Sequence, residues 1–375
     1  MAEVTFRNIS FTAPKAEGPS AVTAIDLEVG DGEFAVVVGP ALSGKSTLLR
    51  LLTGLEKPAQ GEIAIGGRPV NDVPPPDREL AMVFHDYALF PQMTVRNNIA
   101  FGLTIRKFPK NEIAKRVQDA AAILEITELL DRKPAALTME QRLRTALGRA
   151  LVRQPKVFLF DEPLANLDPP VAATMRTELA KLHQRLGTTF VYTTRDPIEA
   201  MSLGDRLIVL RAGRVQQSAS LTAIYDAPAN LFVASFIGNP PMNLIHGSLK
   251  PERDGWLFRE RDEGTIELRL PLAESANASA LAGKEVVLGI RPEAIALAPV
   301  DAPKNSANTF PALLEVVESL GAESDLHLQT GAHVLVCRTA AMIDRKEAGR
   351  RMRLTINPAK THLFDPVSTE RIPPP

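Results

Sequence analysis

Residues 39–46, with the sequence GPALSGKS, restrict the fold of this chain more than any other segment. They match the spacing GxxxxGK[ST], follow five apolar residues at 34–38 and precede a helix-like pattern at 46–55. A glycine-rich loop between a strand and a helix turns backbone N–H groups onto an anion, and the helix N-terminus adds partial positive charge. We therefore expect a phosphate-binding loop. The alternative, a glycine-rich turn with a solvated lysine, is disfavoured by this context.

The loop also predicts which residues hold a nucleotide and its metal. Lys45 is expected to reach the β- and γ-phosphates, and Ser46 is expected to hold Mg²⁺. The predicted nucleotide-binding residues are Gly39, Pro40, Ser43, Gly44, Lys45, Ser46 and Thr47.

A phosphate-binding site with Mg²⁺ also needs acidic residues near the metal, and two such residues are present. Asp161 and Glu162 directly follow the apolar run 157–160, at the end of a strand where ligands bind in open α/β sheets. We expect Asp161 to hold Mg²⁺ through water, and Glu162 to orient or deprotonate the attacking water. The pattern predicts a nucleoside triphosphatase. A small GTPase is disfavoured, because the chain lacks an NKxD motif.

The rest of the N-terminal part alternates apolar runs with helix-period segments. Continuous apolar runs at 34–38, 157–160, 189–192 and 207–210 are typical of strands buried on both faces of a parallel sheet. Apolar residues at helical spacing occupy 113–124, 143–151 and 175–186, and Gly187 stands where a helix C-terminal cap belongs. This alternation predicts an α/β fold.

The hydrophobic pattern of the sequence changes after Pro240-Pro241. Residues 266–270 alternate apolar and charged side chains, and further apolar strand-like segments at 326–328 and 334–336 flank Gly331. Such segments predict a small all-β domain of barrel type. We expect a boundary near residue 238, with a nucleotide-binding domain at 1–238 and a β-barrel domain at 239–375.

Composition limits the partners and the compartment. The 375 residues include 43 Lys+Arg and 44 Asp+Glu. This balance of charge does not favour binding to nucleic acid or to an anionic membrane surface. Cys337 is the only cysteine, so no internal disulfide forms, and a reducing compartment is expected. We expect Cys337 to be a buried strand residue. No apolar run reaches the ~18–20 residues that span a bilayer, and no secretory signal is recognised at the N-terminus.

The combined motifs resemble the ATPase subunit of bacterial ABC importers, in the maltose, glycerol-phosphate and related carbohydrate branch. The resemblance covers nearly the whole chain and rests on residues 38–47, 82–91, 141–142, 150–151, 158–168, 196–201, 236–243 and 289–293. It implies a P-loop ATPase domain with a helical subdomain, followed by an oligonucleotide-fold-like regulatory barrel of TOBE type.

The resemblance also implies partners and cofactors. In the family, two ATPase subunits lie head to tail, and ATP with Mg²⁺ is held between one phosphate loop and the opposite LSGGQ segment. Closure and hydrolysis drive two membrane permeases, which receive solute from a solute-binding protein. We accordingly expect a peripheral subunit on the cytoplasmic face of the inner membrane, with no nucleic-acid partner. The implied solute is a sugar, polyol, glycerol or glycerol phosphate.

The LSGGQ segment departs from the family pattern. It is Leu137-Thr138-Met139-Glu140-Gln141, so bulk and negative charge stand where the family has glycines. Loss of one preorganised donor costs ~3 kcal/mol of transition-state stabilisation. Thr138 with Gln141 still fits a capping box, so the helix start is expected to survive.

Three further positions differ from the family. Its switch histidine is here Arg195, which only donates hydrogen bonds, and its metal-facing glutamine is here His85. Arg195 either impairs ATP hydrolysis or substitutes for the histidine, and both interpretations remain open. His85 either takes the place of the glutamine or is a loop residue in contact with solvent. The adenine-stacking position falls near 13–14, where no aromatic stands. We expect Phe11, two residues earlier, to be a core residue, with adenine stacking as the alternative.

Asp168, in the segment that crosses between subunits, is retained. We hypothesise an ATP-binding subunit that hydrolyses slowly beside a different, complete ATPase subunit, with a homodimer as the alternative. A non-catalytic ATP sensor and a soluble ATPase without a membrane partner are the competing functions.

Overall fold

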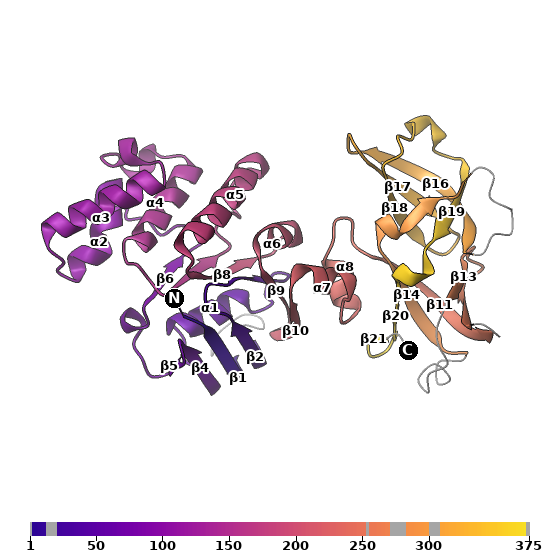
Figure 1. Ribbon diagram of the computed structural model, residues 1–375, viewed down its shortest axis with the longest axis horizontal. Coiled ribbons are helices and arrows are strands. Elements are labelled where there is room, and N and C mark those ends of the chain that lie inside the picture. The colour runs from indigo at the N-terminus through magenta and orange to yellow at the C-terminus, as the bar shows by residue number, and fades with distance from the viewer. Residues whose placement is uncertain (1, 13–20, 253–254, 271–282, 300–307, 373–375) are drawn as a thin grey trace. The chain divides into compact units, whose positions relative to one another are not determined.

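A computed structural model describes residues 2–12, 21–252, 255–270, 283–299 and 308–372 (Figure 1). The chain forms two compact units, Met1–Ile224 and Tyr225–Pro375. The second unit therefore begins at Tyr225, before the expected boundary near residue 238. It includes the segment that leads to the barrel.

A mostly parallel sheet forms the centre of the first unit. Its strand order is β10-β9-β3-β8-β7-β6, and only the edge pair β9 and β10 is antiparallel. The predicted apolar runs all lie in this sheet as fully or largely buried strands. The strands are β3 (Phe34–Val38), β6 (Leu80–Val83), β7 (Val157–Asp161), β8 (Thr189–Thr194), β9 (Arg206–Arg211) and β10 (Arg214–Ala219).

A second, antiparallel sheet shares a core with the first. Its order is β2-β1-β4-β5, and leucines of α1 pack between strands of both sheets. Phe11 is buried in this core, as expected, whereas the position near 13–14 lies outside the described residues. The elements are β1 (Val4–Thr12), β2 (Ala21–Val29), α1 (Lys45–Thr53), β4 (Gln60–Ile65) and β5 (Arg68–Pro69).

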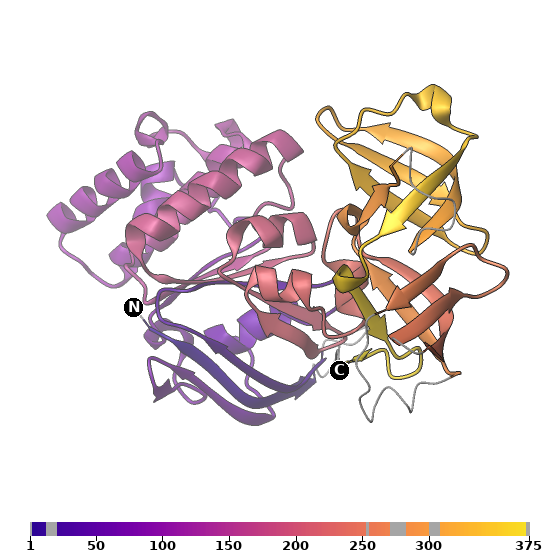
Figure 2. The same cartoon turned by 45° about the vertical axis from the view of Figure 1, so that its right-hand side comes forward.

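Besides α1, the helices α2 to α6 of the first unit fall into two groups. Three of them, α2 (Val95–Ile105), α3 (Lys110–Ile123) and α4 (Met139–Leu151), pack against one another as the helical subdomain. In Figures 1 and 2 they lie across the unit from β1, β2 and β4. The other two, α5 (Pro169–Leu186) and α6 (Pro197–Leu203), contact each other. Gly187 ends α5 at a φ of 61°, as predicted.

The second unit is a β structure with two sheets around one core. The sheet orders are β13-β12-β11-β14-β20-β21 and β15-β19-β16-β17-β18. Cys337 is buried in the shared core on strand β18, as predicted, and Trp256 is buried in the same core. Two short helices precede the barrel: α7 (Leu221–Asp226), which spans the division between the units, and α8 (Leu231–Phe236).

The barrel strands are β11 (Asn243–Glu252), β12 (Gly255–Glu260), β13 (Glu267–Leu270), β14 (Glu285–Ile290), β15 (Ile295–Leu297), β16 (Thr309–Ser319), β17 (Ser324–Gln329), β18 (Val334–Thr339), β19 (Arg351–Ile356), β20 (Thr361–Phe364) and β21 (Arg371–Ile372). No helix in the described ranges is long and apolar enough to cross a membrane.

The Gly39 backbone lies close to the Leu210 carbonyl oxygen, which leads to a prediction about stability. A Cβ there would lie 2.1 Å from the Leu210 carbonyl oxygen, so Gly39→Ala is expected to destabilise the first unit by about 2–3 kcal/mol. Gly102→Ala is the control: its Cβ has room within α2, and alanine favours a helix by about 1 kcal/mol. Thermal unfolding followed by far-ultraviolet circular dichroism measures both. Equal melting temperatures for the two variants would contradict the prediction.

Candidate functional site

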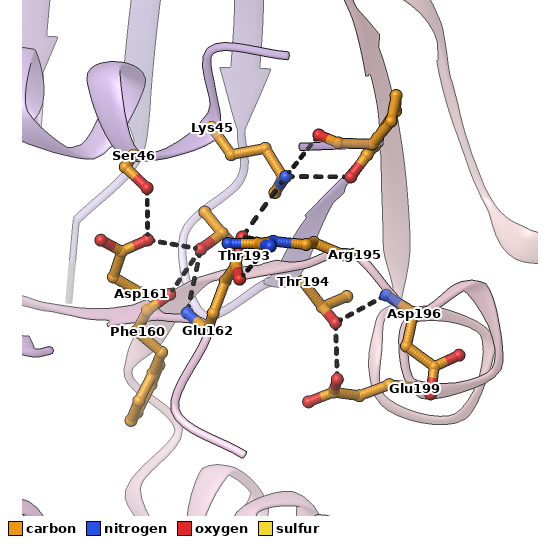
Figure 3. A network of polar contacts seen from close by, with 12 residues as sticks. Lys45, Ser46, Phe160, Asp161, Glu162, Thr193, Thr194, Arg195, Asp196 and Glu199 are labelled. Carbon is orange, nitrogen blue, oxygen red and sulfur yellow. Dashed lines mark hydrogen bonds and ion pairs between the residues drawn. The ribbon is translucent and has the colours of Figure 1, made fainter. Parts of the chain in front are cut away.

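The ends of three adjacent parallel strands bring the predicted site together. Strand β8 lies between β3 and β7, with Val38 opposite Thr194 and Asp161 opposite Thr193. Parallel strands present their carboxyl ends at one edge of the sheet, where the following loops meet. Figure 3 shows the resulting cluster of side chains, drawn from loop 39–46, from the end of β7 and from the segment after β8.

The phosphate-binding loop closes around the Lys45 ammonium. Its Nζ donates to the carbonyl oxygens of Gly39 and Pro40, both at 2.9 Å, and lies 3.4 Å from Glu162 Oε1. Burial lowers the pKa of Lys45, and the Glu162 carboxylate opposes that shift. Gly44 takes a φ of 102° directly before α1, a conformation that suits glycine.

Ser43 gives the loop an unused polar group. Its Oγ is buried and has no hydrogen-bond partner among the described residues. A buried hydroxyl without a partner is costly unless a ligand supplies one. Together with the α1 N-terminus and the buried lysine, this hydroxyl fits a phosphate group.

Ser46 and Asp161 form the candidate magnesium pair. Ser46 Oγ donates to Asp161 Oδ1 at 2.9 Å, and Thr193 Oγ1 donates to the same oxygen at 3.0 Å. Asp161 is buried at the end of β7. Hydroxyl and carboxylate oxygens suit Mg²⁺, which usually keeps several waters and takes few protein ligands. The residues present therefore fit the metal that the sequence predicted.

Glu162 is shared by two cations. Arg195 Nε lies 2.7 Å from Glu162 Oε2 and 3.0 Å from Oε1, on the side chain that Lys45 also approaches (Figure 3). The Glu162 side chain is only 12% exposed, whereas that of Arg195 is 63% exposed. The Glu162 backbone has a φ of 46° and its N–H donates to the Thr193 carbonyl oxygen at 3.1 Å. Arg195 therefore binds the predicted catalytic acid directly, a contact that the sequence analysis did not anticipate.

The loop after β6 contributes main chain to this region. Asn166 Nδ2 donates to the His85 carbonyl oxygen at 2.8 Å, which joins the loop to the segment before Asp168. In the described part of the chain, the His85 imidazole makes no hydrogen bond with Asp161 or Glu162. Asp168 is the N-cap residue of α5.

The segment at 137–141 begins α4, in the helical subdomain. Thr138 and Gln141 form the predicted capping box. Glu140 is paired with Arg144 at 3.0 Å, and Arg144 also binds Glu178 of α5 at 2.6 Å. Arg144, which also lies 3.8 Å from Glu125, is thus shared by three carboxylates and offsets only part of the negative charge that replaces a family glycine. Met139 is 38% exposed.

Sequence reasoning missed two groups near the acids. Thr193 bridges Asp161 and the Glu162 backbone, and Glu199 of α6 is buried beside Thr194. A strand-end threonine is a weak signal in one sequence, because its partner strand is unknown until the sheet order is known.

A groove lies between the sheet and the helical subdomain. It has a volume of about 640 Å³ and is lined largely by apolar side chains, among them Phe84, Phe90, Phe101 and Ile105. Arg149 supports its wall by donating to the carbonyl oxygens of Tyr87 and Ala88 at 2.8 and 2.5 Å.

Comparison with known families agrees with both units. Residues 22–165 match the ABC transporter family, residues 238–295 match the MalK OB fold domain, and residues 288–364 match the TOBE domain. Solved structures match the first unit: cbiO1 from Clostridium perfringens (27% identity, 58% of this chain and 88% of that chain, TM-score 0.53) and a dimeric ATP-binding cassette bound to ADP and Pi (29%, 58% and 98%, TM-score 0.52).

Curated relatives match along almost the whole chain. The sn-glycerol-3-phosphate import ATP-binding protein UgpC of Bordetella avium is 43% identical over 99% of both chains. UgpC of Yersinia pseudotuberculosis is 46% identical over 94% of this chain and 95% of its own. The uncharacterized ABC transporter ATP-binding protein YurJ of Bacillus subtilis is 44% identical over 99% of this chain and 100% of its own. This chain belongs to the ATP-binding subunits of ABC importers, in the maltose-type branch that carries an OB and TOBE domain after its ATPase domain.

Proposed function

We propose that this chain binds Mg²⁺–ATP and hydrolyses it slowly, as one ATP-binding subunit of an importer for glycerol phosphate or a related sugar, polyol or glycerol. The observation that supports hydrolysis most is the convergence at one sheet edge of a buried lysine, a hydroxyl–carboxylate pair and a second carboxylate (Figure 3).

Each group has a proposed role. The loop amides, Ser43 and Lys45 hold the β- and γ-phosphates, while Ser46 and Asp161 hold Mg²⁺, which when bound neutralises charge on the phosphate oxygens. Glu162 orients the attacking water or accepts its proton. Glu162 must first leave Arg195, because a carboxylate bound to a guanidinium is a weaker proton acceptor.

The membrane partners are proposed to bind at the groove beside Phe90. ATP-binding subunits of importers work with membrane permeases, and an apolar groove of this size suits a short helix of such a partner. We propose two permeases, fed by a solute-binding protein, and a peripheral position at the cytoplasmic face of the inner membrane. The groove is the observation that argues against a soluble ATPase without a membrane partner.

The solute proposal rests on the relatives. Several similar proteins are named for sn-glycerol-3-phosphate import, and the sequence resemblance also includes sugars, polyols and glycerol. The solute contacts the permeases and the solute-binding protein, so the ATPase residues do not select it.

Pairing with a different, complete ATPase subunit is proposed from the altered positions. In a head-to-tail pair, Lys45 and Glu162 would face the partner's intact signature, while the partner's phosphate loop would face Met139 and Glu140. Glu140 is paired with Arg144, which Glu125 and Glu178 also contact, and its carboxylate offers no donor to phosphate. A homodimer would place an altered segment opposite both phosphate loops.

A second candidate is a non-catalytic ATP sensor. The ion pair between Arg195 and Glu162 favours it, because the pair occupies the only carboxylate available as a base beside Lys45 in the described site.

Turnover measured on the purified chain tests the pairing. Alone, the chain is expected to release phosphate well below ~1 per second, within the slow end of enzyme turnover, and to speed up when mixed with a complete ATPase subunit and the permeases. A rate of ~1 per second or above for the chain alone would contradict slow hydrolysis. An unchanged rate in the mixture would contradict pairing.

Glu162→Gln separates energy coupling from sensing. The amide cannot accept a proton from water, so solute uptake into cells or proteoliposomes is expected to fall at least ~100-fold, while ATP binding is retained. Persistence of uptake would support the sensor. Lys45→Ala is the companion variant, in which loss of nucleotide binding is expected.

Arg195→His tests the altered switch position. A neutral imidazole frees Glu162 and both donates and accepts, so kcat is expected to rise about tenfold. The double variant Arg195→His with Glu162→Gln is the control and should show no gain. Unchanged or lower phosphate release in the single variant would mean that Arg195 is a working substitute.

A further inference from the structure

A buried carboxylate on α6 lies beside the segment that carries Arg195. Glu199 is 8% exposed, and its two oxygens accept hydrogen bonds from the hydroxyls of Tyr192 and Thr194, the latter at 2.5 Å. The Thr194 hydroxyl in turn accepts from the Asp196 backbone N–H at 3.0 Å. Glu199 is thus linked through one hydroxyl to the residues on both sides of Arg195 (Figure 3).

The Arg195 side chain has few other restraints. It is 63% exposed, and its described side-chain partner is Glu162. A long exposed side chain loses rotamer freedom when it is held in one geometry. Its position over Glu162 therefore depends on the backbone between Thr194 and Asp196.

We infer that Glu199 is a positioning residue, which acts through Thr194 to hold the Arg195 segment so that the guanidinium reaches Glu162. The inference rests on the proposed role of Glu162 as the group that handles the attacking water. Among the described residues, the Glu199 carboxylate is hydrogen-bonded to Tyr192 and Thr194 and not to Lys45, Ser46, Asp161 or Glu162.

The surroundings of Glu199 make this link sensitive to protonation. Burial raises the pKa of Glu199 to about 7, the positive charge of Arg176 on α5 opposes the shift, and the Glu162 carboxylate adds to it. Tyr192 is the titratable group on β8, and β3, which also packs against α6, is apolar throughout. The ionised carboxylate accepts from both hydroxyls. The protonated acid must donate at one oxygen, so the hydroxyl bound there must turn from donor to acceptor or lose its hydrogen bond.

The sign of the stability effect follows from the shift. Because the folded state raises the pKa above its ordinary 4.5, the folded state holds the proton more tightly. The contribution of Glu199 to the free energy of unfolding therefore decreases as the pH rises from about 4.5 to about 7, and is constant above that. The ionised form costs stability and keeps the Arg195 segment in place.

The side-chain Nε–H signal of Arg195 tests the inference directly. We would label the full chain with [¹⁵N]arginine, assign the signal by its loss in Arg195→Lys, and titrate from pH 5.5 to 8.5. In the unmodified chain the chemical shift is expected to change with a midpoint near pH 7. In Glu199→Gln the change is expected to disappear.

Two further variants keep the test decisive. Thr194→Val keeps the β-branched shape and removes only the linking hydroxyl, so it should also abolish the change while Glu199 still titrates. Glu28→Gln, at an exposed position of β2, is the matched control and should leave the titration unaltered. The inference is wrong if the unmodified chain shows no transition, or if Glu199→Gln or Thr194→Val retains it. Thr194→Val decides alone if Glu199→Gln does not fold.

Kinetics separate this inference from the proposed function. For a positioning residue, Glu199→Gln should release Glu162 from Arg195, so kcat should rise by up to about tenfold, as in Arg195→His, while KM for ATP stays within about twofold. A fall in melting temperature with kcat unchanged would indicate a merely structural role. If the unmodified chain hydrolyses no ATP, the proposed function fails, whereas the Arg195 titration still decides the role of Glu199.

Discussion

The burial of the Lys45 ammonium is the constraint on which the rest of the site depends. A cation removed from water must be surrounded by oxygen atoms, and here these come from the carbonyls of Gly39 and Pro40 and from Glu162. The loop must therefore curl tightly, which requires close approach at Gly39, and an acid must stand at the end of β7. The sheet order delivers that acid, because β8 alone separates β3 from β7.

Much of this architecture could be predicted from the sequence, because buried parallel strands and loop motifs are local patterns. The strands at 34–38 and 157–161, the helix end at Gly187 and the capping box at Thr138 needed only neighbouring residues. The pair between Arg195 and Glu162 could not be predicted so directly. It depends on β7 and β8 being adjacent, and no spacing along the chain encodes that adjacency.

The departures from the family pattern share a physical property. Arg195 and Glu140 each place a charge where the family has a neutral group, and each is paired with a residue of opposite charge in this same chain. Such pairs are worth little at exposed positions and more where water is excluded. Arg144 is only 11% exposed; it binds Glu140 within α4 and joins α4 to α5 through Glu178, so the altered segment is held firmly in the helical subdomain.

The position of Trp256 has an optical consequence. It is the single tryptophan of the chain and it is buried in the barrel core. Indole emission excited at the red edge of the absorption band therefore reports on the barrel alone, and the ATPase unit contributes no indole signal. If a tryptophan is introduced into the first unit, its emission can be obtained by subtracting the known emission of Trp256. Each unit can therefore be given its own fluorophore.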